Sequence, residues 1–251
     1  FRFMLGNLKD NFEKQDFEKI NLADLDELEQ FILHKLYLIG NSVTENLKSY
    51  NFHKLYKELL NFCALDLSSF YFDIRKDVLY CDSLNSKKRK NCVTVLNIIL
   101  ESLLKWFAPI LVFTTEEIHS LVDKNKESIH ENDFVKIPNK WKNDKLNEKW
   151  SKLFKIKQET NVAIEEKRIS KEIGSSLDAE IKLSLSKEKF ELLNDIDLAE
   201  YFIVSKAEKK LSKHDDIKIE VSKAEGEKCE RCWKILESQC KRCSNIAGSK
   251  V

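Results

Sequence analysis

The spacing of apolar residues predicts helices in the first half of the chain. From Asn21, leucine, isoleucine and valine recur every three or four residues as far as Leu47, which is the period of one helix face. Asn21 is a residue type that favours the N-cap position. A second stretch of the same period opens at Asn51 and runs to Leu67. We therefore expect two long helices joined by a short turn.

Two further helices are predicted after these. Ser86 precedes a third periodic stretch, which Pro109 interrupts because proline cannot continue a helix. Thr114 and Glu117 have the spacing of a capping box, and they predict a fourth, short helix through Leu121. Long helices with a single apolar stripe must pack on one another, so the first half is predicted to form an up-and-down helical bundle.

A polar segment and a last long helix follow the bundle. The segment Asp123–Lys149 is rich in charged residues, contains Pro138 and Trp141, and is predicted to be a linker laid over the surface. Apolar spacing then predicts a helix from Trp150 to about Arg168.

Alternation of apolar and polar residues predicts strands in the next segment. It runs through Ala179–Leu185 and again through Ile217–Val221, which is the period of a half-buried strand. The short apolar run Tyr201–Val204 is interpreted as another strand. The segment Lys187–Asn194 is predicted to be a helix. Together these elements predict a small α/β connector behind the bundle.

Composition agrees with a helical protein and limits the kind of partner. The 251 residues include two prolines and five glycines, which favours long helices over many turns. The 43 basic and 42 acidic residues give a net charge of +1. A polyanion would therefore have to bind at local basic patches.

No apolar run reaches the roughly 18 residues of a membrane span, and no signal peptide is recognised.

The last part of the chain carries two Cys-x-x-Cys pairs. Cys229 and Cys232 form the first, and Cys240 and Cys243 form the second, seven residues later. This is the spacing of a tetrahedral four-thiolate zinc site. With four protein ligands no position stays open for water or substrate, so the metal would be structural. The alternatives are two disulfides or four ordinary thiols.

The other cysteines indicate a reducing compartment. Cys63, Cys81 and Cys92 are scattered, and Cys63 and Cys92 stand among apolar residues, as small buried side chains do. This usage predicts a cytoplasmic protein.

No catalytic site is predicted within the chain. The five histidines are far apart, and His34 is interpreted as a solvated residue on the second face of its helix. Adjacent pairs such as Glu165 and Glu166 point to different sides of a helix, so they cannot work as a dyad. No glycine-rich phosphate loop is found.

Two basic segments have the composition of a phosphate-binding surface. The run Lys87–Lys90 opens a predicted helix, where cations oppose the helix dipole. Lys167, Arg168 and Lys171 form a basic corner before Gly174. A solvated basic turn is the alternative for the first segment.

The cysteine pairs hold a third set of candidate nucleic-acid contacts. Arg231 and Trp233 flank Cys232, and Lys241 and Arg242 lie within the second pair. A rigid knuckle can present an indole for base stacking beside cations that meet phosphate. The alternative for Trp233 is a ring folded over the metal cluster as its hydrophobic cover.

The chain resembles the anticodon-binding part of bacterial isoleucyl-tRNA synthetases along essentially its whole length. The most specific block is Ser222–Trp233, which reads Ser-Lys-Ala-Glu-Gly-Glu-Lys-Cys-Glu-Arg-Cys-Trp and, with the four-cysteine site, separates this family from its valyl and leucyl relatives. The other similar blocks are Phe1–Asp10, Phe62–Asp77, Ala108–Glu117 and Lys171–Ala179.

The resemblance implies a role in joining isoleucine to its tRNA with ATP. Neither the His-Ile-Gly-His nor the Lys-Met-Ser-Lys-Ser type of motif occurs here, so ATP and Mg²⁺ would act in upstream catalytic and editing domains. The chain begins at Phe1 without methionine and is expected to be the carboxy-terminal piece. The resemblance also implies that Arg231 and Trp233 lie against the anticodon. The loop Trp233–Gln239 between the knuckles is shorter than in many members.

The resulting prediction is a mainly α protein. It comprises an anticodon-binding helical bundle (1–125), a surface linker (126–149), a helix with a small α/β connector (150–222) and a zinc module (223–251). The expected function is recognition of an isoleucine-specific tRNA by a monomer that does not bind membranes. The alternative is a non-enzymatic helical interaction protein whose zinc module docks a protein partner.

Overall fold

The computed structural model divides the chain into two compact units. It describes residues 1–8, 12–123, 127–214 and 216–247. The remaining positions, which fall in the predicted bundle, linker, connector and zinc module, lie outside the described residues. The first unit comprises Phe1–Leu79 and Ser83–Asp144, and the second comprises Tyr80–Asp82 and Lys145–Val251.

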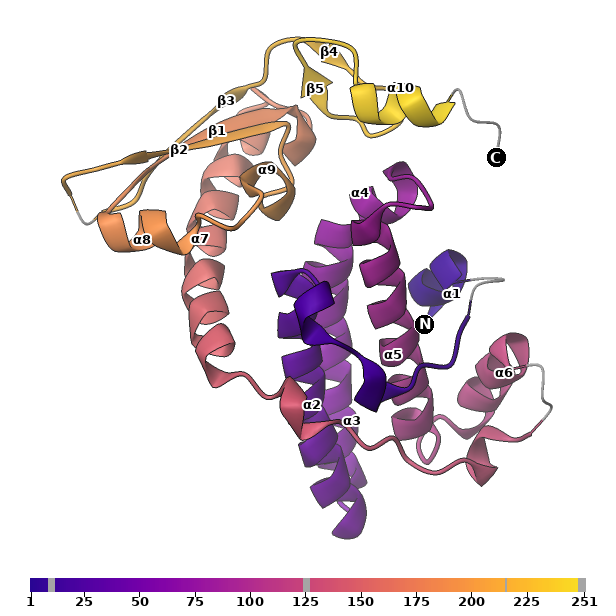
Figure 1. Ribbon diagram of the computed structural model, residues 1–251. Helices are drawn as coiled ribbons and strands as arrows, with labels where there is room; N and C mark the ends of the chain where they lie inside the picture. Colours follow the sequence, from indigo (N-terminus) through magenta and orange to yellow (C-terminus); the bar gives the residue numbers. More distant parts are fainter. Residues whose placement is uncertain (9–11, 124–126, 215, 248–251) are drawn as a thin grey trace. The chain divides into compact units, whose positions relative to one another are not determined.

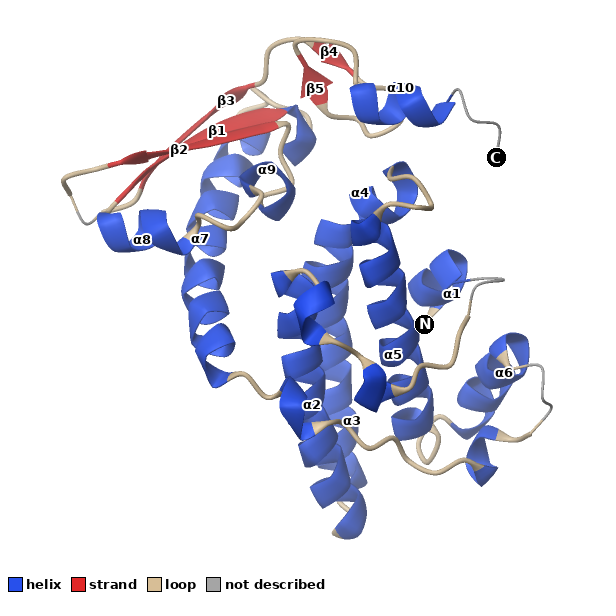
Figure 2. Cartoon of the chain, viewed as in Figure 1, coloured by secondary structure: helices blue, strands red, loops and turns tan. Residues whose placement is uncertain are grey.

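Helices form the first unit (Figure 1). Its longest elements are α2 (Glu27–Lys48) and α5 (Lys87–Phe107), which pack against each other. The other elements are α1 (Arg2–Leu8), η2 (Phe17–Lys19), η3 (Leu22–Asp24), α3 (Phe52–Asn61), η4 (Phe62–Phe72), α4 (Asp73–Cys81, of which Tyr80 and Cys81 belong to the second unit), α6 (Val112–Val122), η5 (Ile129–Glu131) and η6 (Asn139–Trp141). In the described residues all strands lie between Ala179 and Leu236 (Figure 2). The prediction of a mainly α protein with a small sheet is confirmed.

Two of the predicted helix starts are confirmed by their caps. The Asn51 side chain accepts from the backbone N–H of Lys54 and opens α3. The Ser86 hydroxyl accepts from the N–H of Arg89 and opens α5. Both satisfy N–H groups that lack a partner within the helix.

The predicted start of the first long helix at Asn21 is wrong. Asn21 caps only the 3₁₀ turn η3, where its side chain accepts from the N–H of Ala23. The backbone then extends at Leu25 and Asp26, and α2 begins at Glu27. A 3₁₀ turn also places residues three apart on one side, so the apolar spacing continued across a break in the helix.

The capping box predicted at Thr114 and Glu117 is also wrong. Helix α6 begins at Val112, and its N-cap Leu111 makes no side-chain cap bond. In the first turn of α6 the Thr115 hydroxyl donates to the Leu111 carbonyl over 2.9 Å. The turn after Pro109 thus starts the helix before the motif is reached.

Part of the predicted surface linker is ordered and buried. Trp141 ends η6 with 1% of its surface exposed and lies 5.4 Å from the ring of Phe17. The last long helix, α7, runs from Asp144 to Ile169, so it begins before the predicted Trp150. A tryptophan with large apolar area fixes this otherwise polar segment on the core.

A buried ion pair lies in the core of the first unit. The Arg75 guanidinium donates to both carboxylate oxygens of Glu29, over 2.7 and 2.6 Å. The Tyr71 hydroxyl donates to the same carboxylate over 3.1 Å. Glu29 has 0% and Arg75 3% of its surface exposed. This network joins α2 to the π-helical segment η4 and to α4.

The second unit contains a three-stranded sheet with strand order β2-β1-β3. Its central strand β1 is parallel to β2, with Ile181 opposite Ala207, and antiparallel to β3, with Ile181 opposite Val221. The helices α7, α8 and α9 lie on one face (Figure 1). The elements that follow α7 are η7 (Ser176–Asp178), β1 (Ala179–Leu185), α8 (Lys187–Leu192), α9 (Leu198–Tyr201), β2 (Lys206–Leu211), β3 (Lys218–Lys223), β4 (Glu227–Lys228), β5 (Ile235–Leu236) and α10 (Lys241–Ala247).

The strand predicted at Tyr201–Val204 is wrong. Tyr201 ends the short helix α9, which the Asp197 side chain caps by accepting from the N–H of Glu200. Ile203 then takes a left-handed conformation with φ of 57°. Short apolar runs cannot be assigned to strand or helix by periodicity alone. The neighbouring strand is β2, which starts at Lys206.

The described helices include none that is both long and apolar enough to cross a membrane.

Candidate metal centre and nucleic-acid interface

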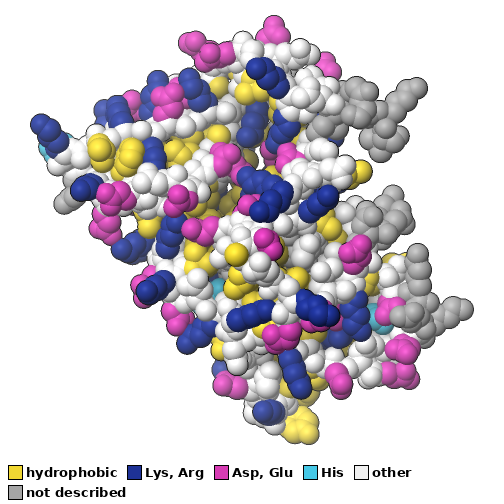
Figure 3. All heavy atoms as spheres, in the orientation of Figure 1, with side chains coloured by type: hydrophobic (Ala, Val, Ile, Leu, Met, Phe, Trp, Pro, Cys, Tyr) yellow, Lys and Arg dark blue, Asp and Glu magenta, His cyan; other side chains and the backbone are white. Residues whose placement is uncertain are grey.

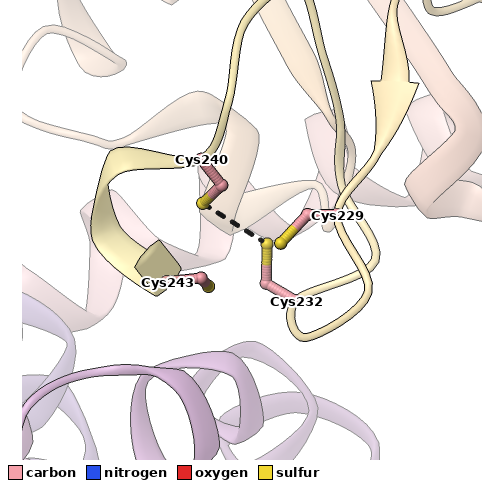
Figure 4. Close-up of side chains that lie close together, drawn as sticks. All are labelled: Cys229, Cys232, Cys240 and Cys243. Carbon is pink, nitrogen blue, oxygen red and sulfur yellow. Dashed lines mark hydrogen bonds between the residues drawn. The ribbon is translucent and has the colours of Figure 1, made fainter. Parts of the chain in front are cut away.

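The four cysteines of the two pairs converge at one point. Cys229 and Cys232 lie in the turn between β4 and β5, and Cys240 and Cys243 lie at the start of α10. Figure 4 shows their sulfur atoms directed toward one another. Backbone bonds shape both knuckles: the N–H of Trp233 donates to the Cys229 carbonyl over 2.8 Å, and that of Ser244 to the Cys240 carbonyl over 2.9 Å.

The sulfur geometry fits a tetrahedral metal ion. All four sulfurs lie within 4.8 Å of one another, and those of Cys232 and Cys240 are 3.9 Å apart. Zinc–sulfur bonds of about 2.3 Å place tetrahedral ligands about 3.8 Å apart. A disulfide needs about 2.05 Å, and all four cysteines are free. The cluster can therefore hold a metal ion through four thiolates.

The surroundings of the thiols differ within each pair. Cys232 and Cys243 are buried, whereas Cys229 and Cys240 are half-buried. The pKa of Cys229 is lowered to about 7, first by a hydrogen bond from the backbone N–H of Cys232 and then by one from that of Arg231. Burial raises the pKa of Cys232 and that of Cys243. A metal ion that binds here displaces the remaining thiol protons.

Gly226 permits the approach of the two short strands that carry the first knuckle. Its φ is +120°, and a Cβ at this position would lie 2.2 Å from the Leu236 carbonyl oxygen. No side chain fits such a distance, and the conformation favours glycine. The glycine of the Glu-Gly-Glu-Lys-Cys motif thus shapes the hairpin that presents Cys229.

Ser205 anchors the four-cysteine module to the connector. Its hydroxyl donates to the Leu177 carbonyl and accepts from the N–H of Ile235 over 2.6 Å. Beside it, Lys228 pairs with Asp178 over 3.2 Å. Sequence reasoning missed all of these residues, because no local pattern marks a serine that bonds to two segments distant in the sequence.

Trp233 follows Cys232 in the first knuckle, and its backbone N–H donates to the Cys229 carbonyl. It has a left-handed conformation with φ of 62°, and 61% of its surface is exposed. A ring that served as hydrophobic cover would be buried against the cysteines. The exposed indole instead offers a face on which a planar group can stack.

The two arginines of the predicted RNA contact already have acceptors in the second unit. Arg231 donates to the Tyr80 carbonyl over 3.1 Å, and the Arg242 guanidinium lies 3.3 Å from the Asp82 carboxylate. If either arginine contacts RNA, its guanidinium must therefore bond to the RNA and to this protein acceptor at the same time. Lys241 opens α10 and is exposed.

The basic corner after α7 is largely neutralised within the chain. Lys167 pairs with Glu172 over 2.7 Å, and Arg168 pairs with Glu165 over 2.7 Å. Lys171 stands between them with φ of 60° and is exposed. The run Lys87–Lys90 forms the first turn of α5, as predicted.

The prediction that His34 is solvated is wrong. His34 has 0% of its surface exposed, and its Nδ1 atom accepts from the backbone N–H of Asn143 over 3.0 Å. Burial lowers the pKa of His34. Within the described ranges, the four cysteines are the one group of three or more potential metal-binding side chains that lie together.

A comparison with family models gives one match. Residues 29–183 match the model described as the anticodon-binding domain of tRNA ligase. The match covers the bundle from α2 onward, the connecting segment, α7 and most of β1.

Comparison with curated proteins finds isoleucine–tRNA ligases. One from Pelagibacter ubique is 53% identical over 98% of this chain and 27% of the relative. The corresponding protein of Caldanaerobacter subterraneus is 38% identical over 94% of the chain, and that of Gluconobacter oxydans is 34% identical over 99%, each again over 27% of the relative. The chain thus spans about a quarter of the length of these relatives.

Proposed function

Since the chain belongs to the family of anticodon-binding domains of tRNA ligases, we propose that it recognises the anticodon stem and loop of an isoleucine-specific tRNA. The family match supports the tRNA as partner, and the names of the relatives support isoleucine. In this role the helical bundle and the four-cysteine module bind RNA, and phosphate contacts position it while base contacts specify it.

The observation that carries the proposal is an exposed tryptophan fixed beside a metal-binding cluster in a chain of this family. Trp233 is 61% exposed, and its backbone N–H is bonded to the first knuckle. The knuckle holds the indole without burying it, which suits stacking on an unpaired anticodon base. Arg231, Lys241 and Arg242 surround the same cluster and supply cations for phosphate.

The metal is proposed to be one structural zinc ion held by Cys229, Cys232, Cys240 and Cys243. The sulfur spacing suits zinc, and thiolates are soft ligands that zinc prefers. Four protein ligands leave no position for a reacting water. The zinc would therefore fix the knuckles and take no part in chemistry.

Catalysis is proposed to lie in parts of a longer ligase. The relatives are nearly four times as long as the matched region, and ATP and Mg²⁺ would act in catalytic and editing domains upstream of this chain. We place this monomeric enzyme in the cytoplasm, where free thiols persist. The division into bundle (1–125), linker (126–149), connector (150–222) and zinc module (223–251) belongs to the same proposal.

Binding to tRNA at several salt concentrations tests the proposed function. We expect the logarithm of the association constant to fall linearly with the logarithm of salt concentration, because bound lysines and arginines release counterions from phosphate. Replacing the isoleucine anticodon in the same tRNA should weaken binding about tenfold, the effect of one lost base contact of about 1.4 kcal/mol. Filter binding or fluorescence anisotropy measures both.

The same titration separates the rival function. A helical protein whose zinc module docks an apolar protein surface would show little dependence on salt. Equal affinity for the native and the exchanged anticodon, or no tRNA binding at all, would contradict the proposal.

Trp233→Ala is expected to weaken tRNA binding by about 1–3 kcal/mol, because one base loses its aromatic stacking partner. Trp233→Phe is the matched variant, since it keeps a ring and should retain most of the affinity. Absorption of the cobalt-substituted site verifies that the metal cluster is intact in both. Unchanged affinity of Trp233→Ala with an intact cluster would assign the indole a structural role.

A further inference from the structure

The end of the α2–α3 hairpin carries a tyrosine in a conformation that normally favours glycine. Tyr50 has φ of 54°, and the N–H of Asn51 donates back to the Asn46 carbonyl over 2.8 Å. This is the bonding pattern of a Schellman helix end, whose left-handed position is usually glycine or asparagine. The bulky ring at this position strains the backbone, and it makes no compensating buried contact, because 80% of its surface is exposed.

Two more aromatic rings are exposed beside it. The Phe52 and Tyr50 rings lie 6.4 Å apart at 68° to each other. Tyr56 follows Phe52 by one helical turn, so both lie on the same side of α3. Phe52 is 40% and Tyr56 42% exposed. The hairpin end is therefore an aromatic surface open to solvent.

Basic side chains flank these rings. The exposed basic residues of this segment are Lys48, His53, Lys54 and Lys57. Its acidic residues are Glu45 and Glu58. The Glu58 carboxylate is engaged within the protein, since it accepts from Ser42 and Asn46 and pairs with Lys54. Figure 3 shows hydrophobic and basic side chains together at this end of α2 and α3, at the bottom of the view.

We propose that this hairpin end, formed by Tyr50, Phe52 and Tyr56 with Lys48 and Lys57, is a second RNA-binding site, on which unpaired bases stack while the lysines contact phosphate. The proposal rests on the function proposed above for the chain and adds a contact remote in sequence from the four cysteines. Stacking surfaces with neighbouring cations bind single-stranded RNA with little sequence preference. The site therefore adds affinity and leaves discrimination of the anticodon to other residues.

RNA is the occupant that the chemistry of this surface favours. The hairpin end lies inside the region 29–183 that matches the anticodon-binding domain of tRNA ligases. Its exposed apolar groups at the turn are aromatic, and the unengaged charges around them are mainly basic. The core of a protein–protein interface is depleted of charged residues, whereas lysines flank the rings of this surface.

Tyr50→Asn in the 251-residue chain tests the proposal. Asparagine tolerates the left-handed conformation, so the melting temperature should stay equal or rise. Binding to tRNA and to an unstructured oligoribonucleotide should each weaken about tenfold, as loss of one stacked base predicts. The control is Ile203→Asn, which relieves the same kind of conformation after α9 without changing a charge and should leave both affinities unchanged.

The possible outcomes separate this proposal from the function proposed above. If Trp233→Ala weakens tRNA binding but Tyr50→Asn does not, the hairpin site is wrong and the anticodon role stands. If Tyr50→Asn weakens binding of both RNAs but the chain does not discriminate the isoleucine anticodon, the hairpin site stands and the isoleucine assignment fails. Absence of RNA binding by the unmodified chain would overturn both.

Discussion

Cys232→Ser is expected to abolish tight metal binding and to unfold the four-cysteine module while the first unit stays helical. The module has little apolar core of its own, and its short strands β4 and β5 are two residues each. A bound metal ion would therefore supply most of its folding free energy, about 10–16 kcal/mol in zinc-finger peptides. Removal of the metal with a chelator should have the same result.

Cobalt substitution and hydrogen exchange measure this effect. The wild-type chain should show the absorption of tetrahedral cobalt thiolate, and the variant should lose it. Amide protection should fall in 227–243 and persist in α5. Cys63→Ser is the matched control, because Cys63 lies in the first unit and burial raises the pKa of its thiol to about 11. Unchanged protection of the module without metal would contradict a structural role for the ion.

Glu29→Ala is expected to destabilise the first unit by about 3–5 kcal/mol, because the buried Arg75 guanidinium loses its two short bonds to Glu29 and keeps only the more distant Asp26 carboxylate, 3.9 Å away, as an acidic partner. The pair is almost fully buried, with Arg75 bonded to both oxygens of Glu29. Tyr71 also loses its acceptor on the same carboxylate. The free energy of unfolding from urea denaturation gives the magnitude.

Two controls identify the buried charge as the cause. Glu188→Ala removes an equally short ion pair, 2.7 Å from Lys152, but on the exposed surface, where such pairs contribute about 0–1 kcal/mol. The double variant Glu29→Leu with Arg75→Leu removes both buried charges and should recover most of the lost stability. A loss below about 1 kcal/mol for Glu29→Ala would contradict this expectation and show that water or the nearby Asp26 carboxylate compensates the guanidinium charge.

Elements with a strong local signal were predictable from the sequence. Asn51 and Ser86 cap helices α3 and α5, and the alternation through Ala179–Leu185 forms β1. A cap bonds to N–H groups two or three residues away, and alternation depends on neighbours along one strand. Both partners of each interaction lie within a few residues of each other, so the pattern can be recognised in the amino-acid sequence.

Elements whose conformation depends on distant contacts were not predictable. The apolar run Tyr201–Val204 predicts a strand, yet Tyr201 is the last residue of helix α9, and its ring packs against that of Trp150 in the second unit. The position of His34 in its helix predicts a solvated side chain, yet its ring accepts from the backbone N–H of Asn143, over a hundred residues away in the sequence. In both cases the partner is absent from the local sequence, and the same local pattern fits either outcome.

The candidate metal centre shows the same division. The sequence by itself determined the four cysteines, because two short Cys-x-x-Cys turns carry their own geometry, and it identified Trp233 as a candidate for stacking. Only the tertiary structure decided that the indole of Trp233 is exposed and that Ser205 anchors the module. It also decided that the backbone of β5 lies so close to Gly226 that no side chain fits there. It also showed that Arg231 and Arg242 already have acceptors. Ligand spacing is a property of adjacent residues, whereas exposure and hydrogen-bond partners depend on which distant segments fold against them.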